Sequence, residues 1–106
     1  MAFEIEIAEE AELDLDGIRP FYRKQILDAI EFYLQHTPTR ESRARIKRLR
    51  SVTSPASRLR VGDFRVYYDV DEEEYLVTVL RVLSKEQSLQ FLREVKDEEN
   101  GSREPE

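Results

Sequence analysis

The sequence contains no cysteine, no tryptophan, a single histidine and only three glycines. The lack of cysteine excludes a disulfide framework and a metal site built from thiolates. No apolar run approaches the roughly 18 residues that a membrane-spanning helix needs. Residues 1–16 carry neither the basic region nor the apolar region of a secretory signal. We therefore expect a cytoplasmic protein with no membrane partner.

Groups that could bind a metal or transfer protons are also scarce. Four acidic residues follow one another at positions 71–74, but they lack the spacing of a calcium-binding loop. The only histidine, His36, falls at the predicted end of a helix, where the helix dipole favours its charged form. A catalytic role for His36 stays open as a lesser alternative, because histidine is the usual acid–base group. We predict no metal and no cofactor.

The charges are segregated along the chain. The formal net charge is −6, yet residues 1–16 carry seven acids and no base, and residues 94–106 carry six acids and two bases. The middle, residues 17–93, carries fifteen Lys and Arg against ten Asp and Glu. Because salt limits the reach of each patch to about 8–10 Å, the positive middle can still favour a nucleic-acid partner.

The first half of the chain predicts one strand followed by helices. The alternation in "FEIEI", residues 3–7, is typical of a half-buried strand, and helical spacing follows over residues 8–16. Pro20 suits the first turn of a second, amphipathic helix that ends near His36. A third, strongly basic short helix is predicted at residues 40–49, and a loop at 50–57. Residues 97–106 have the composition of a disordered acidic tail.

Gly62 and Asp63 predict a two-residue hairpin of type II′, which determines the register of the flanking strands. In that register Arg60 faces Arg65 and Arg58 faces Tyr67, and facing residues share one side of the sheet. The apolar side, which we expect in the core, carries Leu59, Val61, Phe64, Val66 and Tyr68. The opposite side carries the arginines, with Tyr67 as a candidate for stacking on a base.

The next strand, "YLVTVLRV", is apolar at both alternating positions. A connection of odd length places Arg81 beside Arg65, whereas an even one buries it, so we predict the odd connection. Lys85 then follows just past the strand. Facing arginines destabilise a sheet, which favours a face neutralised by a polyanion or an acidic peptide. The alternative is that these arginines simply keep a sheet edge soluble.

The segments "IKRLRS" and "SRLRVGDFRVYYDVDEEEYLVTVLRV" resemble the RelE/ParE toxin superfamily of type II toxin–antitoxin modules. The resemblance covers about residues 3–92. It implies an α+β fold of β-α-α-β-β-β-α order, in which an N-terminal strand and a helical hairpin pack on an antiparallel sheet. We expect one RelE-like domain over residues 1–96.

The resemblance also implies site residues. Arg60 and Arg65 would hold the scissile phosphate, and Lys85 would donate a proton to the leaving oxygen. RNA-binding roles fall to Arg58 and Phe91 by the resemblance, and to Tyr67 and Arg81 by their predicted position on the arginine-bearing side of the sheet. Phe91 stands where relatives have tyrosine, and Arg58 and Arg60 stand where they have lysine. We expect Arg65→Ala to reduce toxicity with near-normal folding, because exposed charges contribute little to stability.

RelE-type toxins cut messenger RNA in the ribosome, so the expected function is inhibition of translation by ribosome-dependent mRNA cleavage. The alternatives are a ParE-like inhibitor of DNA gyrase, a catalytically silent relative that still binds its antitoxin, and a regulatory protein whose basic face meets an acidic peptide. The expected partners are a cognate antitoxin protein, in a toxin–antitoxin hetero-oligomer, together with the ribosome and mRNA.

Overall fold

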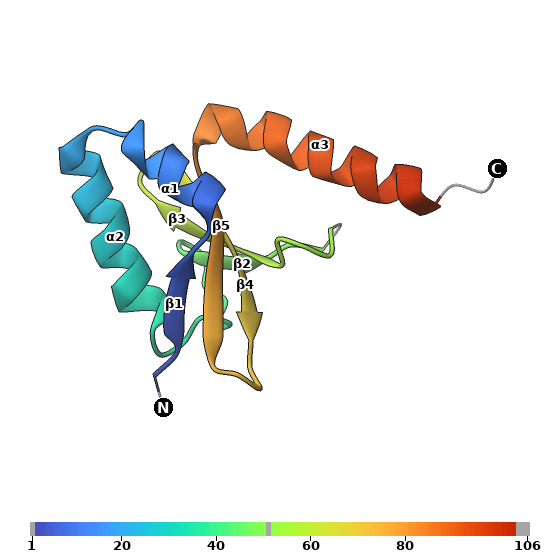
Figure 1. Ribbon diagram of the computed structural model, residues 1–106. Helices are drawn as coiled ribbons and strands as arrows, with labels where there is room; N and C mark the ends of the chain where they lie inside the picture. The colour runs from blue at the N-terminus through green and yellow to red at the C-terminus, as the bar shows by residue number, and fades with distance from the viewer. Residues whose placement is uncertain (1, 51, 104–106) are drawn as a thin grey trace.

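The computed structural model describes residues 2–50 and 52–103 and has an α+β fold with one five-stranded sheet (Figure 1). The strand order is β1-β5-β4-β3-β2, and β1 runs parallel to β5 while the other pairs are antiparallel. The predicted fold class is confirmed. The elements in chain order are β1 (Glu4–Ile7), α1 (Glu9–Asp16), α2 (Pro20–Leu34), β2 (Ile46–Arg48), β3 (Ser57–Val61), β4 (Phe64–Asp71), β5 (Leu76–Ser84) and α3 (Lys85–Arg103).

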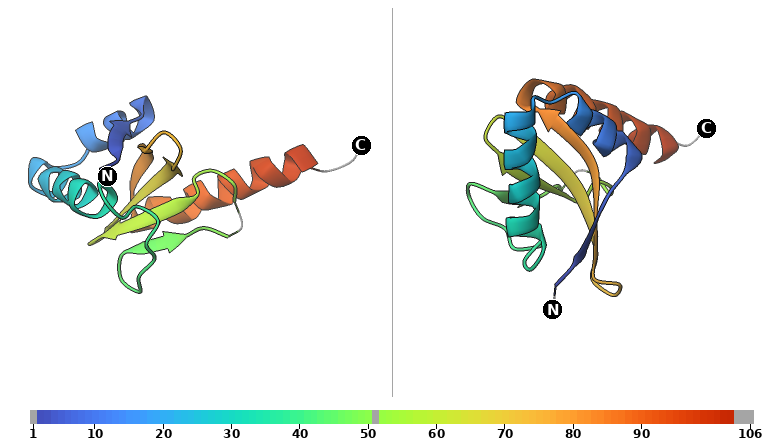
Figure 2. Two further views of the ribbon diagram at one scale, coloured as in Figure 1. Left: turned by 90° about the horizontal axis from the view of Figure 1, so that it is seen from below. Right: turned by 60° about the vertical axis from the view of Figure 1, so that its left-hand side comes forward.

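The two N-terminal helices lie together on one side of the sheet, whereas α3 extends away from it (Figures 1 and 2). Acidic residues in the first turn of α1 are favourable with the helix dipole, and Pro20 begins α2 as predicted. The helix α2 buries Ile26, Ile30 and Leu34 at intervals of four residues. The helices and the inner face of the sheet therefore enclose a single apolar core.

The apolar side of the β3–β4 hairpin joins this core as predicted. Leu59, Val66 and Tyr68 are fully buried. The Tyr68 hydroxyl donates a hydrogen bond of 2.6 Å to the Pro38 carbonyl, so the buried phenol has a partner. The opposite side of the hairpin is thereby directed away from α1 and α2.

The predicted third helix at residues 40–49 is wrong, because its last part forms strand β2. Ile46 is 3% exposed and pairs with Leu59, which places it in the core. The strand supplies hydrogen-bond partners to the outer edge of β3, whereas a helix here has few apolar residues to bury. The Ser42 hydroxyl accepts hydrogen bonds from the N–H groups of Arg45 and Ile46 and shapes the turn before the strand.

The predicted odd connection between β4 and β5 is also wrong. Asp71 pairs with Leu76, which leaves a loop of four residues, 72–75. Such a loop alone turns Arg81 toward the core. A β-bulge corrects this: Tyr68 pairs with Val79 while Tyr67 pairs with Arg81, so the intervening Leu80 is the additional residue. Arg81 therefore lies opposite Tyr67 rather than beside Arg65.

Helix α3 starts directly after β5 with a capping box. The Ser84 hydroxyl accepts from the Gln87 N–H, and the Gln87 side chain accepts from the Ser84 N–H. The helix runs to Arg103, so the predicted disordered tail is helical from 97 to 103 in this structure; residues 104–106 lie outside the described part. The predicted domain boundary at residue 96 stays a prediction. Within the described residues, no helix is long and apolar enough to cross a membrane.

Candidate functional site

The outward side of the hairpin, together with β2, forms the candidate site. Gly62 has a φ of +56°, whereas the φ of Asp63 is not positive, as a type II′ turn requires. The predicted pairs Arg60–Arg65 and Arg58–Tyr67 are observed. Strand β2 adds Lys47 opposite Arg58, on the same side of the sheet. We call Lys47, Arg58, Arg60 and Arg65 the basic face.

Arg65 is the most enclosed member of the basic face. Only 7% of it is exposed, which differs from the exposed side chain expected from the sequence. Its Nη1 donates hydrogen bonds of 3.0 Å to the carbonyls of Gly62 and Phe64. Burial lowers the pKa of Arg65, and the neighbouring charges of Arg60 and Arg58 lower it further. The folded chain thus holds this guanidinium in a place unfavourable to its charge.

The acidic charge of Asp63 offsets only part of the repulsion at Arg65, because burial and the two neighbouring arginines still lower its pKa. None of the ion pairs among the described residues includes a member of the basic face. Arg60 and Lys47 are exposed, and the half-buried Arg58 has an Nε atom without a hydrogen-bond partner in the described structure. Unpaired guanidinium groups that lie together are suited to bind an anion with several oxygens, such as a phosphate.

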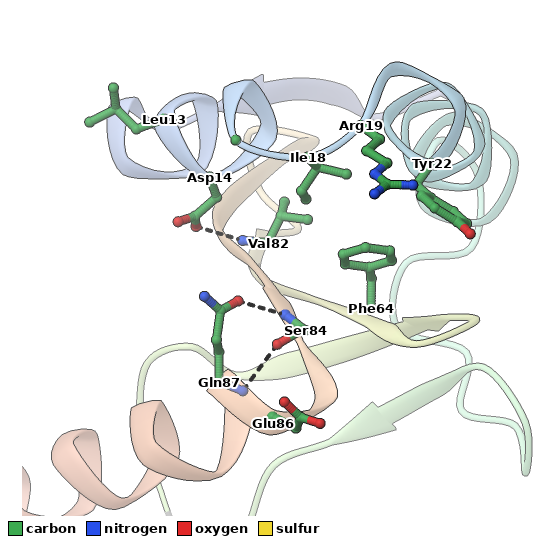
Figure 3. A pocket seen from close by; sticks show the side chains of 11 residues that line it. Leu13, Asp14, Ile18, Arg19, Tyr22, Phe64, Val82, Ser84, Glu86 and Gln87 are labelled. Atoms are coloured by element: carbon green, nitrogen blue, oxygen red, sulfur yellow. Dashed lines mark hydrogen bonds between the residues drawn. The ribbon is translucent and has the colours of Figure 1, made fainter.

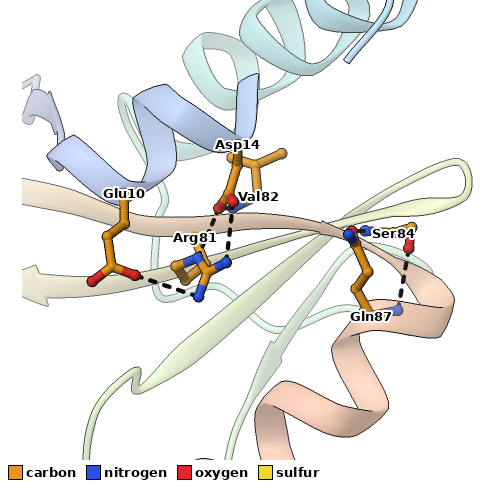
Figure 4. Close-up of polar contacts among 6 residues, drawn as sticks. All are labelled: Glu10, Asp14, Arg81, Val82, Ser84 and Gln87. Carbon is orange, nitrogen blue, oxygen red and sulfur yellow. Dashed lines mark hydrogen bonds and ion pairs between the residues drawn. The ribbon is translucent and has the colours of Figure 1, made fainter. Parts of the chain in front are cut away.

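Arg81 has a different environment from the basic face (Figure 4). Its Nε and Nη2 donate hydrogen bonds of 2.8 and 3.1 Å to the two carboxylate oxygens of Asp14, and its Nη1 lies 3.5 Å from Glu10. The hydrogen bonds to Asp14, followed by the nearby acidic charges, outweigh burial and raise the pKa of Arg81. Two acids of helix α1 therefore neutralise this arginine, a pairing that the sequence did not reveal.

Lys85 lies beside the hairpin turn that carries Arg65. Its backbone N–H donates to the Asp63 carbonyl at 2.8 Å, and the preceding Ser84 pairs with Phe64. The side chain is exposed. The sheet and the start of α3 thus bring Lys85 next to the basic face, although twenty residues separate it from Arg65 in the sequence.

The two predicted stacking residues contact each other. Tyr67 is only 1% exposed, and its ring centroid lies 5.1 Å from that of Phe91 on α3. Phe91 is half-buried, and the guanidinium carbon of Arg81 lies over its ring, 5.5 Å from the ring centroid. In this conformation Phe91 retains an open surface, whereas Tyr67 has almost none.

A cavity of about 660 Å³ lies on a different part of the molecule, between α1, the start of α2, strands β4 and β5, and the start of α3 (Figure 3). Ile18, Phe64 and Val82 form apolar parts of its wall, and Arg19 and Glu86 also line it. None of the predicted site residues lines this cavity. The exposed basic face, and not the cavity, is therefore the candidate site.

Comparison with known proteins agrees with the fold and with the sequence resemblance. Residues 5–89 match the family model described as the ParE toxin of the type II toxin–antitoxin system parDE. No curated protein matches the chain at a significant level.

Similar solved structures come from RelE proteins. The RelBE2 toxin–antitoxin complex of Mycobacterium tuberculosis matches with a TM-score of 0.66 and 25% identity, over 79% of this chain and 99% of the other. The RelE–RelB complex of Pyrococcus horikoshii matches with a TM-score of 0.64 and 20% identity, over 79% of this chain and 96% of the other. The isolated Escherichia coli RelE toxin matches with a TM-score of 0.63 and 18% identity, over 87% of this chain and 99% of the other.

The family model covers most of the chain, and the RelE structures share its fold. The chain therefore belongs to the ParE/RelE toxin superfamily of type II toxin–antitoxin systems.

Proposed function

We propose that this toxin inhibits translation by ribosome-dependent cleavage of messenger RNA, and that the basic face binds the scissile phosphate. The observation that carries the proposal is the buried charge of Arg65, which has no ion pair among the described residues and lies close to the charges of Arg58 and Arg60. A phosphate group at this position replaces repulsion among arginines with charge-assisted hydrogen bonds.

The chemistry follows from these groups. The 2′-hydroxyl of the RNA attacks the adjacent phosphorus and loses its proton to water. The bond to the 5′-oxygen breaks, which leaves a 2′,3′-cyclic phosphate and a 5′-hydroxyl. Arg60 and Arg65 stabilise the negative charge that develops on the phosphate oxygens. The exposed Lys85 donates a proton to the leaving 5′-oxygen.

The remaining residues bind the RNA on either side of the scissile bond. Arg58 and its strand neighbour Lys47 contact a flanking phosphate, and the open surface of Phe91 stacks on a displaced base. Phe91 has no hydroxyl, so it takes no part in proton transfer. Arg81 has no RNA contact in this scheme, because Asp14 and Glu10 neutralise it.

The partner of this toxin is a cognate antitoxin protein. The relatives from Mycobacterium tuberculosis and Pyrococcus horikoshii were crystallised as complexes of RelE with RelB. We propose a comparable hetero-oligomer here, in which a segment of the antitoxin covers or distorts the basic face and so blocks access of RNA.

A ParE-like inhibitor of DNA gyrase is the second candidate, and the match to the ParE family model favours it. The shared scaffold does not decide between the two activities, since function resides in the site rather than in the fold. A silent relative that retains only antitoxin binding is the third outcome of the same experiment.

The test is to express the chain alone in a bacterial host and to map message ends and DNA breaks. Cuts inside translated codons with 2′,3′-cyclic phosphate ends, lost in Arg60→Ala, support the proposal. Arg60 is the preferred variant because it is exposed, so its loss leaves the core intact. Lys24→Ala, another exposed cation outside the site, is the control. Gyrase-dependent DNA breaks with intact messages contradict the proposal. A folded protein that damages neither messages nor DNA contradicts it as well.

A further inference from the structure

Arg81 on β5 contacts two elements that are distant in the sequence: α1, through Asp14 (Figure 4), and α3, through Phe91. Its guanidinium forms a two-point contact with Asp14 on one side and lies over the ring of Phe91 on the other. We call the Asp14–Arg81–Phe91 contact the clamp. The β-bulge at Leu80 makes the clamp possible, because without it Arg81 points into the core.

The Asp14 carboxylate accepts three hydrogen bonds. Besides the two bonds from Arg81 it accepts a hydrogen bond of 2.9 Å from the Val82 N–H, at the edge of β5 beyond the end of β1. The side chains of Asp14 and Arg81 are 15% and 28% exposed, so solvent screens their pairing less than it screens a surface ion pair. Glu10, at 3.5 Å and 74% exposed, is more strongly screened by solvent and contributes less than Asp14.

Helix α3 contacts the rest of the chain through the clamp, through the Lys85 N–H bond to the Asp63 carbonyl, and through Glu99, which accepts from the Thr53 N–H. The helix leaves the sheet after its first turns (Figure 1), and its Leu89 is 69% exposed. The half-buried ring of Phe91 contacts both Arg81 and the buried Tyr67, which face each other across β4 and β5, and so attaches these turns to the sheet. Lys85 is the first residue of the same helix.

We propose that Asp14 is a positioning residue: through Arg81 and Phe91 it holds the first turns of α3, and with them Lys85, in place beside the basic face. The expected effect on RNA cleavage rests on the proposed function, whereas the expected effect on the stability of α3 does not. An error of about 1 Å in the position of a reacting group can lower a rate by roughly 100-fold.

The test compares Asp14→Asn with Asp28→Asn. Asn at position 14 keeps the shape and an acceptor for Val82 but removes the charge. Asp28 forms an exposed ion pair with Lys24 at 3.1 Å and is the matched control. Amide hydrogen exchange in residues 88–92 is expected to accelerate at least about tenfold in Asp14→Asn, with unchanged exchange in β3 and β4, and not in Asp28→Asn.

In ribosomal cleavage assays, kcat is expected to fall by about 10- to 100-fold in Asp14→Asn. KM is expected to rise by a smaller factor, because the basic face stays intact while the stacking residue Phe91 loosens with α3. Arg81→Lys, which keeps the charge but loses the two-point contact, is the second variant if Asp14→Asn lowers global stability. It is expected to accelerate exchange in α3 in the same selective way.

A double-mutant cycle shows whether Asp14 acts through Phe91. In a Phe91→Leu background, Asp14→Asn is expected to have no further effect on exchange in α3 or on kcat. Additive effects contradict the inference, and so does unchanged α3 exchange in both clamp variants. If the wild-type protein cleaves no RNA, the exchange measurements still decide the mechanical part, so failure of the proposed function is distinguishable from failure of the clamp.

Discussion

Because the charge of Arg65 is buried beside other positive charges, we predict that a bound anion stabilises the folded protein. An anion that binds only the folded protein raises its free energy of unfolding by RT ln(1 + [L]/Kd), which is about 1.4 kcal/mol when [L] is ten times Kd. A domain of roughly 100 residues gains about 4 °C or more in Tm per kcal/mol, so the expected rise is about 6 °C. Pyrophosphate is a suitable probe because its oxygens can contact Arg60 and Arg65 together.

The decisive variant is Arg65→Met, which keeps an unbranched side chain in a site that is 7% exposed but removes the charge. It loses two hydrogen bonds to the carbonyls of Gly62 and Phe64 and also removes the repulsion from Arg58 and Arg60. Because these effects oppose each other, we expect it to lower the free energy of unfolding by no more than about 2 kcal/mol. The rise in Tm that pyrophosphate causes in this variant should be less than half of the rise in the wild-type protein.

The assay is thermal unfolding followed by circular dichroism over a pyrophosphate titration at constant ionic strength, with Lys24→Met as the control. The control should retain the full rise in Tm. If Arg65→Met and the wild-type protein gain stability equally, the anion binds elsewhere and Arg65 is not the centre of the site. A variant that does not fold at all would show that Arg65 is required by the structure itself.

Three further results are expected. Tyr68→Phe should lower the free energy of unfolding by about 1–3 kcal/mol in urea titrations, because the buried Pro38 carbonyl loses its donor; an unchanged midpoint contradicts this. Lys47→Ala should reduce the slope of log K against log[salt] for single-stranded RNA by about 0.7, since one phosphate contact is lost; an identical slope excludes Lys47 from the interface. Gly62→Ala should lower Tm by several degrees, because φ is +56° there and the cost is about 1 kcal/mol; an equal Tm contradicts the type II′ turn.

Local sequence patterns were sufficient for much of the fold. The alternation in residues 3–7, the helical spacing around Ile26 and Ile30, and the Gly62–Asp63 turn each act over a few residues, so each predicts its element without the rest of the chain. The turn also determines the pairing of Arg58 and Arg60 across the hairpin, which correctly grouped the three arginines of the basic face on one side of the sheet, without Lys47.

The errors concern features that depend on contacts between distant segments. Residues 46–48 form a strand because the edge of β3 is available to pair with them, which their own basic composition does not reveal. The cost of burying a charge gave the right face for Arg81, but the odd connection inferred from it was wrong, because an even loop and the bulge at Leu80 together produce that face. The extended α3 likewise differs from the disordered tail expected from its acidic composition.

The sequence by itself determined the fold class, the hairpin register and the arginines that share one face, because strand periodicity and turn geometry are local. Only the tertiary structure decided which of these charges have an ion pair. Asp14 forms an ion pair with Arg81 across 67 residues of chain, whereas Arg65 has no ion pair among the described residues and only the charge of Asp63 to offset its neighbours. The reason is physical: the free energy of a charge depends on its burial and its neighbours in space, and both are set by how distant segments pack.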